Sequence, residues 1–305
     1  MHSKNQEIRL PLLSEKGITI HIKREDRIHP LISGNKYRKL KYNLAAVKES
    51  NIKTLLTYGG AYSNHIAAVA FAGKKEGLET IGVVRGEELQ DKWQDNPTLT
   101  LANAHGMHFI FVSREKYRNK MDRGFQKELM ARFGPFYSLP EGGTNTLAVT
   151  GCEEILTPED ARFNVIGCSV GTGGTLAGLI NASRGHQHIL GFPAVKGDFL
   201  QEDIRKFAPR GNWSLQTAYT FGGYAKVPDA LIEFINVFYQ NTGIPLDPIY
   251  TGKMMFGILE MVRNNRFKAN TRILAIHTGG LQGIEGMNQK LTRQGRPPIR
   301  FKGKI

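Results

Sequence analysis

The 305-residue sequence predicts an α/β fold in which parallel sheets are covered by helices on both faces. Two observations lead to this prediction. Short apolar segments typical of buried strands alternate along the chain with amphipathic segments typical of helices. Several of these strands also run directly into glycine turns that open a helix. The chain length and a hydrophobic content of 40% fit one or two domains with a sizeable core.

The first half of the chain carries a clear alternation of strands and helices. The expected strands are 18–24, 54–58, 80–84 and 108–112. The expected helices are one that begins near Lys36, 66–75, one that begins near Pro97, and 116–132. Residues from about 41 to 144 therefore resemble a small unit of alternating strands and helices.

A second alternating unit follows the glycine cluster Glu141–Asn145. Its expected strands are 163–170, 188–191, 218–221 and 273–277. Its expected helices are 148–155, 176–182, 228–241 and 252–263. Taking the glycine cluster as a boundary gives a small domain of residues 41–144 and a large domain of residues 1–40 and 145–305.

The chain is strongly basic, with a net charge of +14 and a pI near 9.7. Its sharpest local concentration of cations is the run Gly295–Lys304. A basic module that binds nucleic acid is therefore an alternative to an enzyme. Most of the excess charge is scattered, however, and anionic small substrates or simple solubility explain it equally well, so nucleic acid is not the favoured partner.

The N-terminal segment and the two cysteines narrow the class of protein. Residues 1–10 lack the apolar core of a signal peptide, and no apolar run is long enough to span a bilayer. These features predict a cytoplasmic protein. Cys152 and Cys168 cannot make a disulfide framework and have no ligand-like spacing with histidines, so we expect two small buried side chains and no metal site.

Lys36 is the candidate nucleophile. Apolar residues spaced three and four apart between Tyr37 and Val47 place it at the open end of a helix. Arg38, Lys39 and Lys41 lie within about a turn, and a helix N-terminus is itself electropositive, so protonation of Lys36 is disfavoured. A neutral amine can attack an aldehyde. A solvated, basic helix start is the alternative interpretation of these residues.

The turn Ser169–Thr175 follows an expected strand and opens an expected helix. Its backbone N–H groups and hydroxyls suit a phosphate dianion. A dinucleotide fingerprint would need a glycine at Leu176, and a P-loop would need Gly-Lys-Ser/Thr, so a smaller phosphate ligand is favoured. A tight turn that holds nothing is the alternative. Together with Lys36, the turn indicates a phosphorylated aldehyde as the ligand.

Four separated motifs resemble those of the fold-type-II pyridoxal-phosphate enzymes, within the group that contains D-cysteine desulfhydrase and 1-aminocyclopropane-1-carboxylate (ACC) deaminase. They are Gly34–Leu40, Ser63–His65, Ser169–Thr175 and Pro248–Lys253. The resemblance covers nearly the whole chain. It implies two open, twisted parallel-sheet domains, as in the β subunit of tryptophan synthase, with pyridoxal 5'-phosphate in the cleft between them, and it implies a homodimer.

The resemblance also assigns the residues that hold the cofactor. Lys36 would bind it covalently, and Asn64 would bond its ring hydroxyl. The phosphate would be held by Gly171, Thr172, Gly173, Gly174 and Thr175. Thr251 would meet the pyridine nitrogen, where the deaminases typically have glutamate and the desulfhydrases typically have threonine.

The substrate would lie against a second set of residues. Ser63 would contact its carboxylate, next to Asn64, His65 and Tyr62. Tyr224 and Tyr250 would face it as polar or acidic groups, although amphipathic core tyrosines are the commoner use of this residue. One departure bears on substrate identity, because relatives commonly carry glutamine at the position of Tyr62. A second departure is Ala225, where glycine is usual.

These features predict a pyridoxal-phosphate-dependent lyase or deaminase that acts on a small amino acid. The favoured reaction is β-elimination from D-cysteine, in which Lys36 or a neighbouring base takes the α proton and pyruvate, ammonia and sulfide are released. The alternative is deamination of ACC to 2-oxobutyrate and ammonia. Thr251 favours the first reaction, since a neutral partner makes the cofactor ring a weaker electron sink. The binding module is a remote third alternative.

Overall fold

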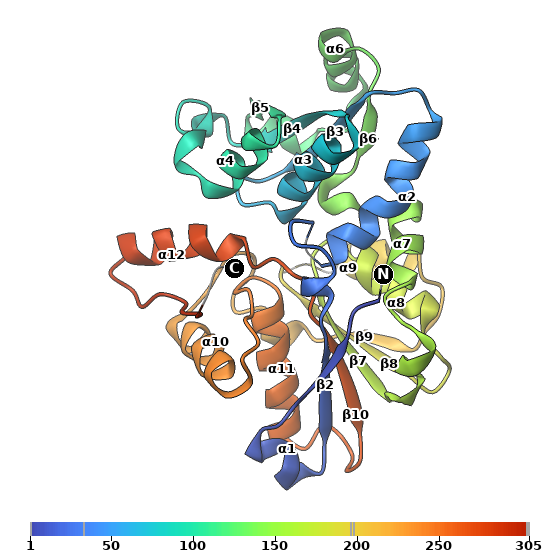
Figure 1. The fold of residues 1–305 in the computed structure, drawn as a ribbon, viewed down its shortest axis with the longest axis vertical. Helices are drawn as coiled ribbons and strands as arrows, with labels where there is room; N and C mark the ends of the chain where they lie inside the picture. The colour runs from blue at the N-terminus through green and yellow to red at the C-terminus, as the bar shows by residue number, and fades with distance from the viewer. Residues whose placement is uncertain (1, 33, 196, 198, 303–305) are drawn as a thin grey trace.

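The computed structural model describes residues 2–32, 34–195, 197 and 199–302, which form two sheets (Figure 1). The six-stranded sheet has the spatial order β1 (Asn5–Ile8), β2 (Thr19–Lys23), β10 (Arg272–Ile276), β7 (Val165–Val170), β8 (His188–Pro193) and β9 (Trp213–Leu215). The four-stranded sheet has the order β5 (Met107–Val112), β4 (Glu79–Arg85), β3 (Thr54–Gly59) and β6 (Tyr137–Leu139). Apart from the antiparallel pair β1–β2, neighbouring strands are parallel, which confirms the predicted fold class.

Helices cover both faces of each sheet. Around the larger sheet lie α1 (Pro11–Lys16), α7 (Thr146–Glu153), α8 (Gly174–Ala182), α9 (Phe199–Arg205), α10 (Asp229–Thr242), α11 (Thr251–Arg263) and α12 (Gly283–Arg293). Around the smaller sheet lie α2 (Asn35–Glu49), α3 (Asn64–Glu76), α4 (Pro97–Ala104), α5 (Arg114–Arg118) and α6 (Arg123–Phe133). Short 3₁₀ turns occupy Glu25–Arg27, Glu87–Leu89, Trp93–Asp95, Glu141–Gly143, Pro158–Arg162 and Thr217–Tyr219.

Strand β10 shows why these sequences form buried parallel strands. Ile273 and Ala275 point into a core with α10, α11 and α12, whereas Leu274 and Ile276 point into a second core with α7 and α8. All four side chains are fully buried. A strand buried on both faces is apolar at successive positions, as in a parallel sheet covered on both sides.

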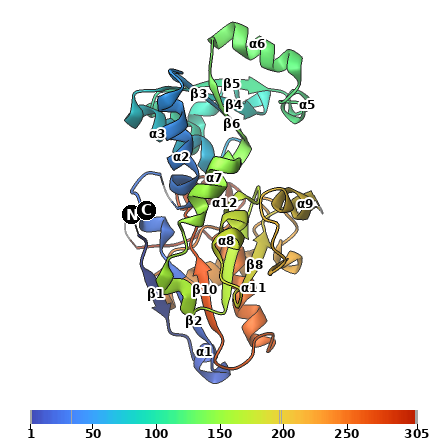
Figure 2. The same cartoon turned by 90° about the vertical axis from the view of Figure 1, so that its right-hand side faces the viewer.

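Helices α2 and α7 lie between the two sheets and pack closely against each other (Figure 2). Gly151 of α7 allows the close approach, because a Cβ atom there would lie 2.1 Å from the carbonyl oxygen of Arg38. The guanidinium of Arg38 donates two hydrogen bonds to the fully buried carboxylate of Glu25, at 2.9 and 3.0 Å. The helix that carries Lys36 is therefore fixed to the larger sheet by packing and by a buried ion pair.

Two predicted elements are wrong. The single helix expected over 116–132 is two helices, because Asp122 caps a new one by accepting hydrogen bonds from the N–H groups of Gly124 and Phe125. The strand expected over 218–221 is a turn, since Phe221 adopts a positive φ of 52° that a strand does not allow. Six elements were not predicted: β1, β6, β9, α1, α9 and α12.

The basic C-terminal run packs against the protein where the structure describes it, up to Lys302. Arg296 forms an ion pair with Asp229 at 2.7 Å. Further along, the backbone is held by the side chains of Asn236 and Tyr239 on α10. The remaining residues, 303–305, lie outside the described range. Over the same described residues, no helix combines the length and the hydropathy that crossing a membrane requires.

Replacing Gly151 with alanine should destabilise the protein, because its methyl group would collide with the backbone of α2. We expect Gly151→Ala to lower the free energy of unfolding by about 1–3 kcal/mol, the usual cost of overpacking. Urea denaturation followed by circular dichroism measures this change. Gly211→Ala is the matched control, since a Cβ atom there meets no atom within 4 Å. Equal midpoints for the two variants would contradict the role given to this helix contact.

Candidate active site

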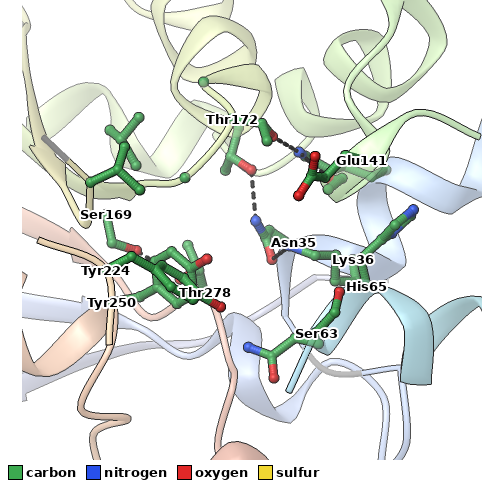
Figure 3. A pocket seen from close by; sticks show the side chains of 18 of the residues that line it. Asn35, Lys36, Ser63, His65, Glu141, Ser169, Thr172, Tyr224, Tyr250 and Thr278 are labelled. Atoms are coloured by element: carbon green, nitrogen blue, oxygen red, sulfur yellow. Dashed lines mark hydrogen bonds between the residues drawn. The ribbon is translucent and has the colours of Figure 1, made fainter. Parts of the chain in front are cut away.

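A cavity of about 490 Å³ lies between the two sheets (Figure 3). Its walls are loops that follow the carboxyl ends of β3, β7 and β10, together with the first turn of α2. Ligands of open α/β sheets bind at this edge, because the loops that leave adjacent parallel strands converge there. The cavity brings together Lys36, Ser63, Asn64, His65 and most of the other predicted site residues.

Lys36 lies in the first turn of α2, and its position depends on a close backbone contact. Gly34 has a φ of 62°, and a Cβ atom there would lie 1.9 Å from the carbonyl oxygen of Thr278. The backbone N–H of Asn35 donates to the same oxygen at 3.3 Å. Glycine is therefore required at position 34 both for its conformation and for the space it leaves.

The amine of Lys36 is set up to be neutral near physiological pH. Burial lowers the pKa of Lys36 to about 7, and the charge of Lys39 acts in the same direction. Its Nζ donates a hydrogen bond to Asn35 Oδ1 at 3.2 Å. An amine with this pKa is substantially unprotonated at neutral pH and can attack a carbonyl carbon.

The glycine turn after β7 forms a cradle for an anion. A Cβ atom at Gly173 would lie 2.7 Å from Ile204, and one at Gly174 would lie 2.7 Å from the hydroxyl of Thr144. The turn leads into α8, whose first N–H groups have no partner within the helix. Asn35 Nδ2 donates to Thr175 Oγ1 at 2.7 Å, which ties the turn to the helix of Lys36. This arrangement fits a phosphate group.

Lys39 is a site residue that the sequence analysis missed. Its buried Nζ donates to Gly142 O and Thr144 Oγ1, both at 2.9 Å, and it lies 3.5 Å from Thr172 Oγ1. It therefore places a cation beside the phosphate cradle. Lys39 follows Lys36 by three residues, which places both side chains on one side of the helix. This spacing is the feature of the sequence that could have identified Lys39 as a site residue.

The facing wall of the cavity is the start of α3. Ser63 caps this helix, and its Oγ accepts from the N–H of Ile66 at 3.3 Å, which leaves its own proton available to a ligand. Asn64 Oδ1 accepts from Gln282 at 2.9 Å, so its amide group is held in place. His65 is 1% exposed, and neither ring nitrogen has a hydrogen-bond partner among the described residues. Unpartnered buried nitrogens of this kind indicate a site built for a ligand.

Two tyrosines close the side of the cavity opposite Lys36 in Figure 3. The rings of Tyr224 and Tyr250 meet edge to face with centroids 6.4 Å apart. Desolvation raises the pKa of the Tyr250 hydroxyl well above its usual value, and the neighbouring Tyr224 acts in the same direction. Tyr250 is therefore a protonated hydroxyl that can donate a hydrogen bond or a proton.

Two predicted cofactor residues do not line the cavity. Gly174 contributes only the helix start. Thr251 is fully buried, and its hydroxyl donates to Asp247 Oδ1 at 2.7 Å and accepts from the Asp247 N–H at 2.9 Å. The structure thus does not bring this hydroxyl to the cavity, and its contact with the cofactor ring stays a prediction.

Thr278 is a further residue of the cavity wall that the sequence analysis missed. Its Oγ1 lies 3.0 Å from Ser169 Oγ.

The residues present fit pyridoxal phosphate. A cradle of glycines with a cation beside it suits the phosphate, and a buried neutral amine suits the aldehyde. His65, whose ring nitrogens have no hydrogen-bond partner among the described residues, lines the same cavity. Among the described residues, no three or more His, Cys, Asp or Glu side chains are grouped so that they could hold a metal ion.

Comparison with known proteins also indicates an enzyme that uses pyridoxal phosphate. The family model described as "Pyridoxal-phosphate dependent enzyme" matches residues 3–279. A protein of Thermotoga maritima, provisionally named 1-aminocyclopropane-1-carboxylate deaminase, is 32% identical over 92% of this chain and 95% of its own length. The mitochondrial bifunctional D-cysteine desulfhydrase/1-aminocyclopropane-1-carboxylate deaminase of Arabidopsis thaliana is 28% identical over 88% of this chain and 74% of its own length.

Among solved structures, one described as an ACC deaminase homologue superposes with a TM-score of 0.81 and 27% identity, over 96% of this chain and 94% of that one. The resemblance found in the sequence motifs is thus confirmed by both kinds of comparison. With nearly its whole length matched by the family model, this chain belongs to the pyridoxal-phosphate-dependent enzymes.

Proposed function

We propose that this enzyme eliminates the β-substituent of a small amino acid, with D-cysteine as the favoured substrate and pyruvate, ammonia and sulfide as products. The observation that carries this proposal is the buried amine of Lys36, whose pKa is lowered to about 7, in a cavity that also holds an anion cradle and the start of α3. The names of the relatives support the same class, since they include D-cysteine desulfhydrase and ACC deaminase.

The cofactor residues are assigned as follows in this proposal. Lys36 bonds the aldehyde, the backbone of Gly171–Thr175 binds the phosphate, and Lys39 neutralises part of its charge. Asn64 donates to the ring hydroxyl from the amide group that Gln282 holds. Bound pyridoxal phosphate supplies an electron-withdrawing ring that stabilises negative charge at the α-carbon of the amino acid.

The substrate is positioned and deprotonated by groups of this chain. Ser63, with the adjoining N-terminus of α3, binds the carboxylate, where the helix end favours an anion. Lys36, once free as an amine, takes the α proton, because its lowered pKa lets it act as a base at neutral pH. Tyr250 stays protonated and delivers a proton to the departing sulfur, with Tyr224 packed against it.

D-cysteine is preferred over ACC in this proposal because the candidate partners of the ring nitrogen are neutral. Thr278 and Ser169 offer hydroxyls at the cavity wall, and the carboxylate of Asp247 is occupied by Thr251 and by backbone N–H groups. A neutral partner leaves the ring a weaker electron sink. Expulsion of a good leaving group needs less of that stabilisation than opening of a carbon ring.

We also propose the domain division expected from the sequence, with residues 1–40 and 145–305 as the large cofactor-binding domain and residues 41–144 as the small one. The composition of the two sheets supports this division, since β3 to β6 all lie within 41–144. A homodimer and a cytoplasmic location remain predictions, from the resemblance and from the sequence respectively.

Lys36→Ala should abolish covalent attachment of the cofactor. Borohydride reduction of the wild-type holoenzyme, followed by trypsin digestion and mass spectrometry, should find the pyridoxyl group on Lys36, because only an amine bonded to the aldehyde is trapped in this way. Lys41→Ala, which removes an exposed lysine of the same helix, should keep the label. A pyridoxyl group on another lysine of the wild-type protein would refute the assignment.

Attachment of the cofactor to the apoprotein should accelerate as pH rises through about 7, because Lys36 loses its proton there. Lys39→Met removes a like charge and should therefore move this midpoint to higher pH. Stopped-flow absorbance with pyridoxal, which carries no phosphate, measures the profile without a contribution from the phosphate cradle. A midpoint near the ordinary lysine value in the wild-type protein would argue against a buried, neutral amine.

D-cysteine should be turned over faster than ACC. The assay measures pyruvate and sulfide from D-cysteine and 2-oxobutyrate from ACC, with L-cysteine as the control for chirality. We expect at least a tenfold higher kcat/KM for D-cysteine, since each factor of ten corresponds to about 1.4 kcal/mol in transition-state binding. Turnover of ACC without any turnover of D-cysteine would overturn the choice between the two reactions.

A further inference from the structure

A second hollow of about 170 Å³ lies behind the aromatic side of the cavity, and we call it the side pocket. Both hollows are bordered by Tyr62, Asn64, Tyr224 and Tyr250, so they share one wall. The remaining lining of the side pocket includes Ala225, Pro248, Ile249, Gly283, Gly286 and Met287. It therefore lies directly next to the place where the proposed substrate binds.

The atoms that line the side pocket are mainly carbon atoms. The carboxylate of Asp247 is fully engaged, because it accepts hydrogen bonds from three backbone N–H groups and from the hydroxyl of Thr251. Asn64 Oδ1 is occupied by Gln282. Lys290, an exposed residue on the same side of α12 as Gly283 and Gly286, adds a cation to the lining. An apolar group can therefore occupy the side pocket without leaving a buried polar atom of its own unpaired.

Helix α12 creates the hollow because it has glycines where it faces the active site. A Cβ atom at Gly286 would lie 2.5 Å from the ring of Tyr62. The ring of Tyr62 therefore packs directly against the backbone of the helix. The residues Tyr62 and Tyr224 are 49% and 44% exposed. Two half-exposed aromatic rings beside an apolar hollow form a surface that an apolar ligand would cover.

The size of the side pocket sets the size of its occupant. An engineered apolar cavity of about 150 Å³ in another protein binds benzene, so a hollow of 170 Å³ holds a propyl to phenyl group. In the proposed function, Lys36 faces the amino group and Ser63 the carboxylate, and the aromatic wall lies on the remaining side. A substituent on the β-carbon would extend toward that wall.

We propose that the side pocket binds an apolar β-substituent, so that the substrate class of this enzyme is S-alkyl or S-aryl cysteines. This inference rests on the proposed function and deepens it. The Cα–H and Cβ–S bonds break, the α proton goes to Lys36, and the sulfur leaves with a proton as a thiol. With one water, RS–CH₂–CH(NH₃⁺)–COO⁻ gives RSH, pyruvate and NH₄⁺, and no oxidant or reductant is needed.

Two isosteric substrates test the inference on the holoenzyme. S-propylcysteine and S-(2-aminoethyl)cysteine differ only in a terminal methyl or ammonium group. We expect kcat/KM for the propyl compound to be at least tenfold higher, because the apolar lining and Lys290 both disfavour a cation. Pyruvate release from both enantiomers of each compound measures this ratio. Equal values, or preference for the aminoethyl compound, would count against the side pocket.

A leucine at Gly283 should fill the side pocket. The backbone there is not left-handed, and a Cβ atom would meet only Asn64 Oδ1, at 3.7 Å, so the substitution fits the helix start. We expect Gly283→Leu to lower the propyl-to-aminoethyl ratio of kcat/KM at least tenfold. Glu285→Leu is the matched control, since it adds the same side chain to the exposed side of the same helix. Bound cofactor, quantified in both variants, shows whether Asn64 still functions.

A binding experiment separates this inference from the proposed function. Saturation-transfer NMR with benzyl alcohol needs no turnover, and we expect at least tenfold weaker binding to Gly283→Leu than to Glu285→Leu. If that difference appears but no amino acid is turned over, the proposed function fails and the apolar site stands. If D-cysteine is turned over, yet Gly283→Leu changes neither the substrate ratio nor the binding of benzyl alcohol, the side pocket is overturned.

Discussion

The active site depends on one backbone contact, between Gly34 and the segment that follows β10. Because a Cβ atom at Gly34 would lie 1.9 Å from the carbonyl oxygen of Thr278, the start of α2 lies directly on the end of the larger sheet. This contact sets the depth of Lys36 in the cavity. It also brings Asn35 within hydrogen-bonding distance of Thr175 in the phosphate cradle. Nucleophile and cradle, far apart in sequence, are thereby held at a fixed separation.

The same depth explains the chemistry of Lys36. A lysine at an exposed helix start would be protonated, but burial and the cation of Lys39 lower the pKa of Lys36 to about 7. Keeping two amines in one buried region is unfavourable for folding, because each resists protonation. A bound phosphate dianion would relieve that cost, which links the stability of the protein to its cofactor.

The sequence predicted those features that depend on neighbours in the chain. The helix of Lys36, the glycine turn at Ser169–Thr175 and the helix expected over 66–75 are local patterns of apolar spacing and turn residues, and the structure has them, although the last helix begins at Asn64. The spacing of Lys39 from Lys36 indicates only that both side chains lie on one side of the helix, whereas its contacts with Gly142 and Thr144 depend on which segments the fold brings together. The role of Thr278 depends on the fold in the same way. Thr251 shows the same limit, since its hydroxyl is engaged by Asp247, a partner that motif matching does not indicate.

The order of strands has a consequence for how the chain folds during synthesis. The four strands of the smaller sheet all precede residue 140, so that sheet can form while the rest of the chain is still being made. In the larger sheet, β2 pairs with β10, and Ile20 lies opposite Ile273. Apart from β1, β2 therefore has no neighbouring strand until β10 has been made. We expect the nascent chain to expose the β10-facing edge of β2 until then, which makes the chain a candidate client for chaperones.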